Sequence, residues 1–103
     1  MNEQLIWLQN WYDANCNGDW EHSYSIKIET LDNPGWMVKI HLNETVLENV
    51  PFQVIELERS ENDWIHCRVE SNQFISACGS KNLLEVLTIF QNWALSTSGE
   101  LSE

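Results

Sequence analysis

The sequence predicts an α+β fold in two layers: an antiparallel meander sheet of about five strands, with an N-terminal and a C-terminal helix packed on one face. Three observations lead to this prediction. Apolar residues recur at helical spacing near both ends of the chain, they alternate with polar residues between those ends, and short turn motifs separate the alternating segments. Short connections favour pairing of neighbouring strands, and helices that cover one face of such a sheet complete two layers.

The first element is an amphipathic helix over residues 3–15. Leu5, Leu8 and Tyr12 share one side of this helix, because residues three and four apart lie on the same face. The pair Asn17-Gly18 follows, and it suits the left-handed residue that commonly ends a helix. The apolar side of this helix is therefore predicted to face the sheet.

A β-hairpin around the motif DNPGW is the most regular pattern in the chain. Apolar residues take every second position from Tyr24 to Ile28 before the motif, and again from Trp36 to Leu42 after it. Pro34 presets the first central position of a turn, and Gly35 is predicted to take a positive φ at the second.

The rest of the chain is predicted to hold three more strands and a closing helix. The strands are expected over residues 52–59, 64–70 and 74–77, with turns at SEND and ESNQ. The helix is expected over residues 81–95 with Ser80 as its N-cap, and residues 97–103 as a flexible tail. A chain of 103 residues buries roughly 65% of its unfolded surface, so residues 1–103 are predicted to be one domain.

The sheet face away from the helices is predicted to be mixed rather than purely solvating. This mixture leaves open a generic interaction domain or a homodimer built on the face around Trp64. The residues expected on it are Lys27, Glu29, Met37, Lys39, His41, Trp64, His66 and Arg68.

Charge is the strongest global feature of the sequence. Sixteen acids oppose five bases, for a formal net charge of −11, and residues 1–26 contain four acids and no base. Such a chain repels nucleic acid and anionic membranes, and it attracts basic proteins over long range. It has no apolar run long enough to span a bilayer, and its three cysteines make an odd count, so we expect a cytoplasmic protein with reduced thiols.

The segment CNGDWEHSY, residues 16–24, concentrates chemically active side chains and admits several interpretations. A thiol nucleophile would use Cys16, or Cys78 just before the closing helix. Asp19 and Glu21 on an extended segment would point the same way about 7 Å apart, a spacing that the paired carboxylates of glycosidases can have. The possible metal ligands are Cys16, Asp19, Glu21, His22, His41 and His66, but none has zinc-type spacing. We therefore predict no cofactor and no metal, and keep a small thiol or metal enzyme as the alternative.

The same segment also fits a surface that binds a basic protein. Carboxylates supply speed and orientation of association, and aromatic side chains supply binding energy. In this interpretation Asp13, Asp19 and Glu21 provide charge, His22 a hydrogen bond, and Trp20 and Trp36 the anchors. A plain structural role, in which the segment joins a helix to a strand, remains the other possibility.

The run WLQNWYDANCNGDWEHSYSIKIETLDNPGW, residues 7–36, resembles the signature of the immunity protein 53 family of bacterial polymorphic toxin systems. The later ERSENDWIHCRVE and NLLEVLTIFQNW are similar to that family's second half. Ser25 stands where the family pattern has glycine, and GSKNLLE replaces a G-D-P-x-N-L-E opening of the last helix. The family pattern maps onto Asp19, Trp20, Glu21, His22, Asp32, Asn33 and Trp36, and it adds Asp32 to the predicted partner-binding residues.

The resemblance implies a small, non-catalytic cytoplasmic protein that binds and neutralises a cognate toxin. Combined with the acidic charge, it predicts a basic toxin domain as the partner, such as a nuclease with a positive substrate groove. A monomer is favoured over a homodimer.

Overall fold

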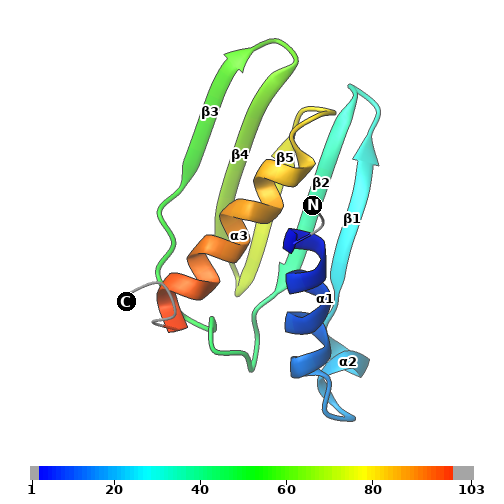
Figure 1. The fold of residues 1–103 in the computed structure, drawn as a ribbon, viewed down its shortest axis with the longest axis vertical. Helices are drawn as coiled ribbons and strands as arrows, with labels where there is room; N and C mark the ends of the chain where they lie inside the picture. Colours follow the sequence, from blue (N-terminus) through cyan, green and yellow to red (C-terminus); the bar gives the residue numbers. More distant parts are fainter. Residues whose placement is uncertain (1–2, 99–103) are drawn as a thin grey trace.

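A computed structural model of the protein describes residues 3–98. It confirms the predicted α+β class: a five-stranded antiparallel sheet carries the N-terminal and C-terminal helices on one face (Figure 1). The helices are α1 (Glu3–Asn15), the short α2 (Trp20–Ser23) and α3 (Leu83–Ser98). The strands are β1 (Ile26–Leu31), β2 (Gly35–His41), β3 (Ile55–Ser60), β4 (Asp63–Glu70) and β5 (Gln73–Cys78).

The strand order is β1-β2-β5-β4-β3, so sequential pairing is interrupted once. β1 pairs with β2, and β3, β4 and β5 form a meander, but β2 lies next to β5 instead of β3. The connection from residue 42 to residue 54 crosses to the far edge of the sheet (Figure 1). Leu42 and Leu47 in this connection are fully buried, which gives the crossing segment a place in the core.

The core lies between the sheet and the helices α1 and α3. Val38, Ile40 and Phe74 from the sheet meet Phe90 from α3, and all four are completely buried. Trp11 of α1 joins them, with its ring centroid 5.2 Å from that of Phe90 at an interplanar angle of 89°. The predicted span of α1, residues 3–15, is confirmed, and α1 packs mainly against α3.

A positive φ was predicted for two glycines, and the structure has it at one of them. Gly18 has a φ of +91°, which confirms the left-handed residue predicted after the first helix. The positive φ predicted for Gly35 is wrong, because Gly18 is the only glycine with one among the described residues. Gly35 instead begins β2, where a Cβ atom would lie 2.3 Å from the carbonyl oxygen of Cys78 on β5. Close strand approach therefore requires glycine there.

The last helix begins two residues later and ends three residues later than predicted. Asn82 precedes its first residue, and the Val86 N–H donates to the Asn82 carbonyl at 3.1 Å, so Ser80 is not the N-cap. Residues 97 and 98 belong to α3 and not to the predicted tail, whose remainder, residues 99–103, lies outside the described residues. Within residues 3–98, no helix is long and apolar enough to cross a membrane.

Candidate functional site: an acidic end beside an apolar hollow

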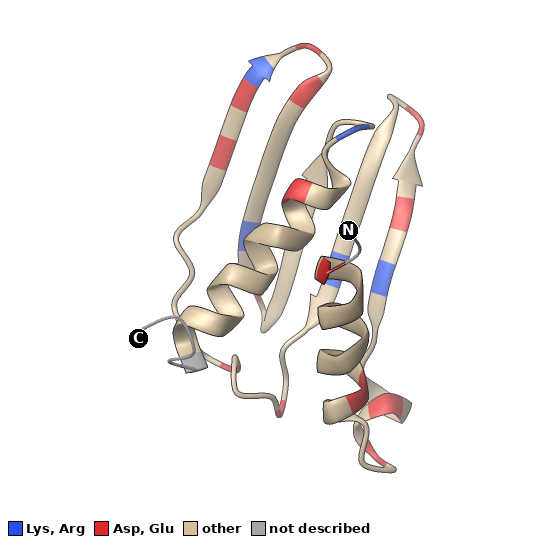
Figure 2. Ribbon diagram, viewed as in Figure 1, with Lys and Arg blue, Asp and Glu red and all other residues tan. Residues whose placement is uncertain are grey.

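Five carboxylates gather at one end of the molecule, from three segments of the chain. No Lys or Arg lies at this end in the described chain, as Figure 2 shows. We call this surface the acidic end. It consists of Asp13 from the last turn of α1, Asp19 and Glu21 from the loop and helix that follow, and Glu44 and Glu48 from the 42–50 connection.

Trp20 holds the two loops of the acidic end together. Its side chain is only 1% exposed, and its Nε1–H donates to the Asn43 carbonyl at 2.8 Å. The ring also lies against Trp11, Tyr12 and Tyr24, with centroids 6.0–6.3 Å away. The side chain of Trp20, predicted as an anchor, is therefore buried in the structure. It is a core residue that positions the acids on both sides of it.

Glu21 is fixed as an ionised carboxylate by the backbone of the preceding loop. Its two oxygens accept the Asn17 N–H at 3.0 Å and the Gly18 N–H at 2.9 Å. Hydrogen bonds from its own backbone N–H first, and then from these two, hold the pKa of the Glu21 carboxyl below its ordinary value against the effect of desolvation. The extended geometry predicted for Asp19 and Glu21 is wrong, because residues 20–23 form a helical turn.

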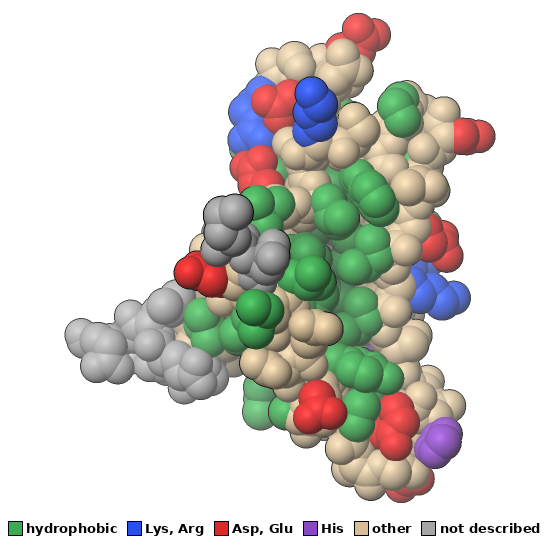
Figure 3. Space-filling view, turned by 45° about the vertical axis from the view of Figure 1, so that its right-hand side comes forward, with side chains coloured by type: hydrophobic (Ala, Val, Ile, Leu, Met, Phe, Trp, Pro, Cys, Tyr) green, Lys and Arg blue, Asp and Glu red, His purple; other side chains and the backbone are tan. Residues whose placement is uncertain are grey.

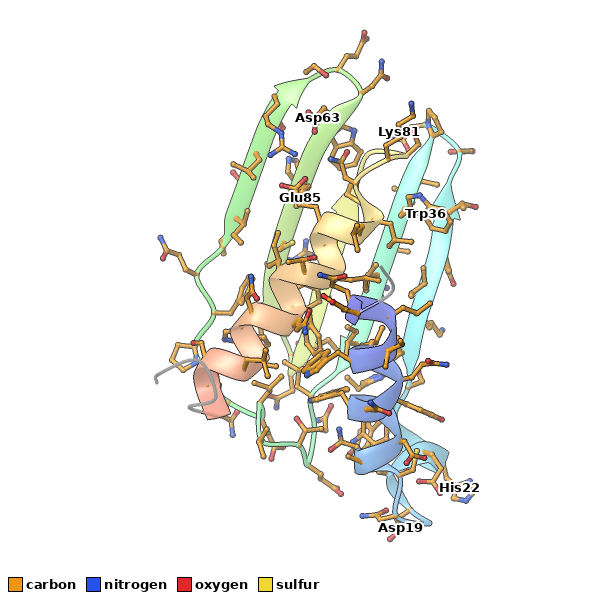
Figure 4. All side chains as sticks on the ribbon, viewed as in Figure 1. Asp19, His22, Trp36, Asp63, Lys81 and Glu85 are labelled. Carbon is orange, nitrogen blue, oxygen red and sulfur yellow. The ribbon has the colours of Figure 1, made fainter. Side chains whose placement is uncertain are left out.

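Asn17, and not Asp19, accepts the backbone N–H groups at the start of that helical turn. The Asn17 side-chain oxygen accepts the N–H groups of Asp19 and Trp20 at 3.0 and 2.9 Å, so it satisfies backbone donors that would otherwise lack partners. Asp19 makes no side-chain capping bond. Its exposed carboxylate, like His22, points outward at the tip of the molecule (Figure 4).

The predicted binding residues are divided between opposite ends of the molecule. Asp13, Asp19, Trp20, Glu21 and His22 lie at or beneath the acidic end (Figures 1 and 4). The other two do not lie there. Asp32 lies in the β1–β2 turn, and Trp36 lies beside it at the opposite end, where its Nε1–H donates to the Ser80 carbonyl at 2.9 Å.

Glu44 and Glu48 were missed by the sequence analysis. They lie in a polar stretch that has the appearance of a plain connection, and no local pattern places it beside residue 20. The structure brings it there through the bond between Trp20 and Asn43. The signal available in the sequence was the two acids in NETVLEN, which continue the excess of acids without indicating where it lies.

An apolar hollow of about 320 Å³ lies next to the acidic end, between α1 and the start of β1. Glu21 forms part of its wall, so the hollow combines an apolar floor with a fixed negative charge. The residues that line it are Leu8, Gln9, Tyr12, Glu21, Tyr24, Ser25 and Ile26.

The histidines and Cys78, named in the alternative interpretations, have separate surroundings in the structure. His22 lies at the acidic end, the Nδ1 atom of His41 accepts the Ser25 N–H at 3.1 Å, and His66 contacts Glu58 at 3.0 Å on the open sheet face. No three His, Cys, Asp or Glu side chains of residues 3–98 converge in a geometry that could hold a metal ion. Burial raises the pKa of the Cys78 thiol to about 11, which opposes formation of a thiolate nucleophile there.

Comparison with known proteins gives one match. No curated protein and no solved structure matches the chain. The family model of immunity protein 53 matches residues 5–95, nearly the whole sequence, including the sheet and most of α1 and α3. The chain belongs to the immunity protein 53 family.

Proposed function

We propose that this protein binds a cognate bacterial toxin in the cytoplasm and neutralises it without catalysis. The observation that carries the proposal is the family match over residues 5–95, since immunity proteins act by binding toxins. The acidic end supports the choice of surface, because five carboxylates with no Lys or Arg beside them in residues 3–98 attract a basic protein from a distance.

The proposed mechanism is occlusion of a basic toxin surface. A toxin that acts on a polyanion needs a positive groove to hold it, and a nuclease is the clearest example. The acidic end offers that groove the same sign of charge as its substrate. Asp13, Asp19, Glu44 and Glu48 would supply exposed charge, Glu21 a fixed acceptor, and His22 a hydrogen bond. Trp20 keeps the two loops in place from below.

The first test is affinity capture of the tagged protein from its native host while the toxin is expressed. Washing at low and then high salt, followed by mass spectrometry, identifies what remains bound. We expect one basic toxin domain at near-equal stoichiometry, and weaker retention at high salt because ionic strength screens surface charges. Retention of no specific protein from a host that expresses the toxin would refute the proposal.

A second test measures neutralisation directly. The toxin domain identified by capture is expressed in a sensitive host with and without this protein, and growth is followed. Growth restored by the wild-type chain, together with a stoichiometric complex of the purified pair, supports neutralisation by binding. Protection at strongly substoichiometric amounts would indicate catalysis and overturn the non-catalytic mechanism.

A further inference from the structure

Apolar side chains continue along α1 and β1 from the hollow beside the acidic end. Leu5 lies one turn before Leu8 on the same side of α1, and Ile28 lies two residues beyond Ile26 on the same face of β1. We call this surface the α1–β1 groove. Its apolar residues are Leu5, Leu8 and Tyr12 on the helix side and Tyr24, Ile26 and Ile28 on the strand side.

Part of this groove is uncovered apolar surface. Leu5 is 51% exposed, Tyr12 39% and Ile28 38%. The cause is the way α1 packs: it leans on α3, and β1 is an edge strand whose only partner among the described strands is β2. Figure 3 shows the apolar side chains as a continuous band that runs down to acidic side chains. Contiguous exposed apolar surface with a polar rim is typical of a binding site.

The charge around the groove indicates what can occupy it. Glu21 lines the hollow at one end, and Asp13 follows Tyr12 directly on α1. Residues 1–26 contain no Lys or Arg, so nothing in this segment balances that charge. A second copy of the chain would bring another formal charge of −11 against the first. A basic segment with an apolar side chain is complementary to both the wall and the end of the groove.

We propose that the α1–β1 groove is the specificity pocket for the toxin. An apolar side chain of the toxin enters between Tyr12 and Ile26, and a neighbouring Lys or Arg of the toxin meets Glu21. This inference rests on the proposed function, because the occupant is a segment of the toxin that the protein neutralises. Long-range charge brings the partners together, and burial of the apolar side chain provides the short-range selectivity.

The test uses the purified toxin domain identified by affinity capture and two matched variants, Leu5→Glu and Leu84→Glu. Both leucines are exposed on long helices, at 51% and 59%, and both substitutions add one negative charge. Charge alone would leave both variants binding a basic toxin as well as the wild type or better. Filling of the groove predicts that only Leu5→Glu loses affinity, by about tenfold or more.

A third variant and measurements of folding and oligomeric state complete the test. Ile28→Thr removes apolar surface from the opposite wall while retaining a β-branched residue, so it is expected to weaken toxin binding without disturbing β1. Circular dichroism and melting temperature verify that each variant is folded, and light scattering reports the oligomeric state. A wild-type dimer that Leu5→Glu converts to monomer would assign the groove to a second copy and overturn the proposal.

The failure of this inference is distinguishable from failure of the proposed function. If the wild type binds the toxin while Leu5→Glu and Ile28→Thr bind as tightly as Leu84→Glu, the groove is not the pocket and the immunity function stands. If capture with the wild type yields no toxin, the proposed function fails and this inference fails with it.

Discussion

At the scale of single residues, two tryptophans each donate an indole N–H to a backbone carbonyl, but in different surroundings. Trp20 donates to Asn43 from a side chain that is 1% exposed, whereas Trp36 donates to Ser80 at a half-exposed position. We expect Trp20→Phe to lower the free energy of unfolding by about 1–3 kcal/mol, because it leaves the Asn43 carbonyl without its donor inside the protein. Trp36→Phe should cost less, since water can reach the Ser80 carbonyl. Urea unfolding followed by circular dichroism measures both, and equal costs would contradict this account.

Arg59 forms the densest ion-pair cluster among the described residues, at the end opposite the acidic end. Its guanidinium contacts Glu85 on α3 at 2.7 Å and Asp63 on β4 at 2.8 Å, so one side chain joins the β3–β4 hairpin to the helix. Asn82 also donates to Asp63 at 2.9 Å. Hydrogen bonds from Arg59 hold the pKa of both carboxyls below their ordinary values, aided at Asp63 by Asn82.

This cluster predicts a pH-dependent contribution to stability. A carboxyl whose pKa is lowered by folding stabilises the folded state above its unfolded pKa of about 4, and that contribution disappears as the pH falls through the lower folded value. Arg59→Gln should therefore lower the melting temperature at pH 7, and the difference from wild type should shrink toward pH 2. Arg68→Gln is the control, because Arg68 has one exposed partner, Glu70, on its own strand. A constant difference for Arg59→Gln across this range would argue against the ion pairs.

At the scale of secondary-structure elements, the sequence predicted the bounds of the strands better than the order in which they pair. Local periodicity identified α1 and all five strands to within three residues, because the spacing of apolar residues is a property of one segment alone. Strand order depends on which strands form hydrogen bonds with each other, and the local pattern of apolar residues does not encode that pairing directly. The sequence did contain one usable signal. In β1 and β3 apolar residues alternate with charged residues, and strands rich in charge are typical of sheet edges.

The approach of β2 to β5 predicts an unusual sensitivity at Gly35. A methyl group there would meet the Cys78 carbonyl oxygen, so Gly35→Ala should cost about 1–3 kcal/mol and loosen the β2–β5 pairing. Gly18→Ala is the comparison. The strain in that variant would come from the φ of +91°, because a Cβ atom added at Gly18 would have no contact within 4 Å. Hydrogen exchange measured by NMR separates them: only Gly35→Ala should accelerate exchange of amides in β2 and β5. Unchanged exchange there would show that the strands tolerate the methyl group.

At the scale of the whole molecule, the candidate site is assembled by contacts that are distant in sequence. The motif GDWEH was recognisable, and its acids do lie on the surface, but its tryptophan turned inward. The local sequence around Trp20 does not distinguish a buried ring from an exposed anchor. The ring is buried because a loop distant in sequence covers it. For the same reason the sequence did not predict that Glu44 and Glu48 lie at the acidic end. It also did not predict that Asp32 and Trp36 lie at the opposite end of the molecule.

The last prediction asks whether toxin binding depends on where the negative charge lies or only on how much there is. The triple variant Asp13→Asn, Asp19→Asn, Glu44→Gln removes three charges from the acidic end. The matched triple Glu29→Gln, Glu56→Gln, Glu61→Gln removes three exposed charges from the sheet and its β3–β4 turn. Both raise the formal net charge equally. Because Coulomb attraction between exposed groups fades beyond about 10 Å at 0.1 M salt, only the first triple should slow association strongly, by about tenfold or more.

Surface plasmon resonance with the captured toxin domain, at low and at high salt, measures this difference as association rates. The two triples should converge at high salt, where screening removes the attraction that distinguishes them. Equal slowing by both triples at low salt would mean that the acidic end is not the docking surface, even though net charge attracts the toxin. Slowing by the second triple alone would move the interface to the open face of the sheet, where Trp64 and His66 lie with their ring centroids 5.4 Å apart.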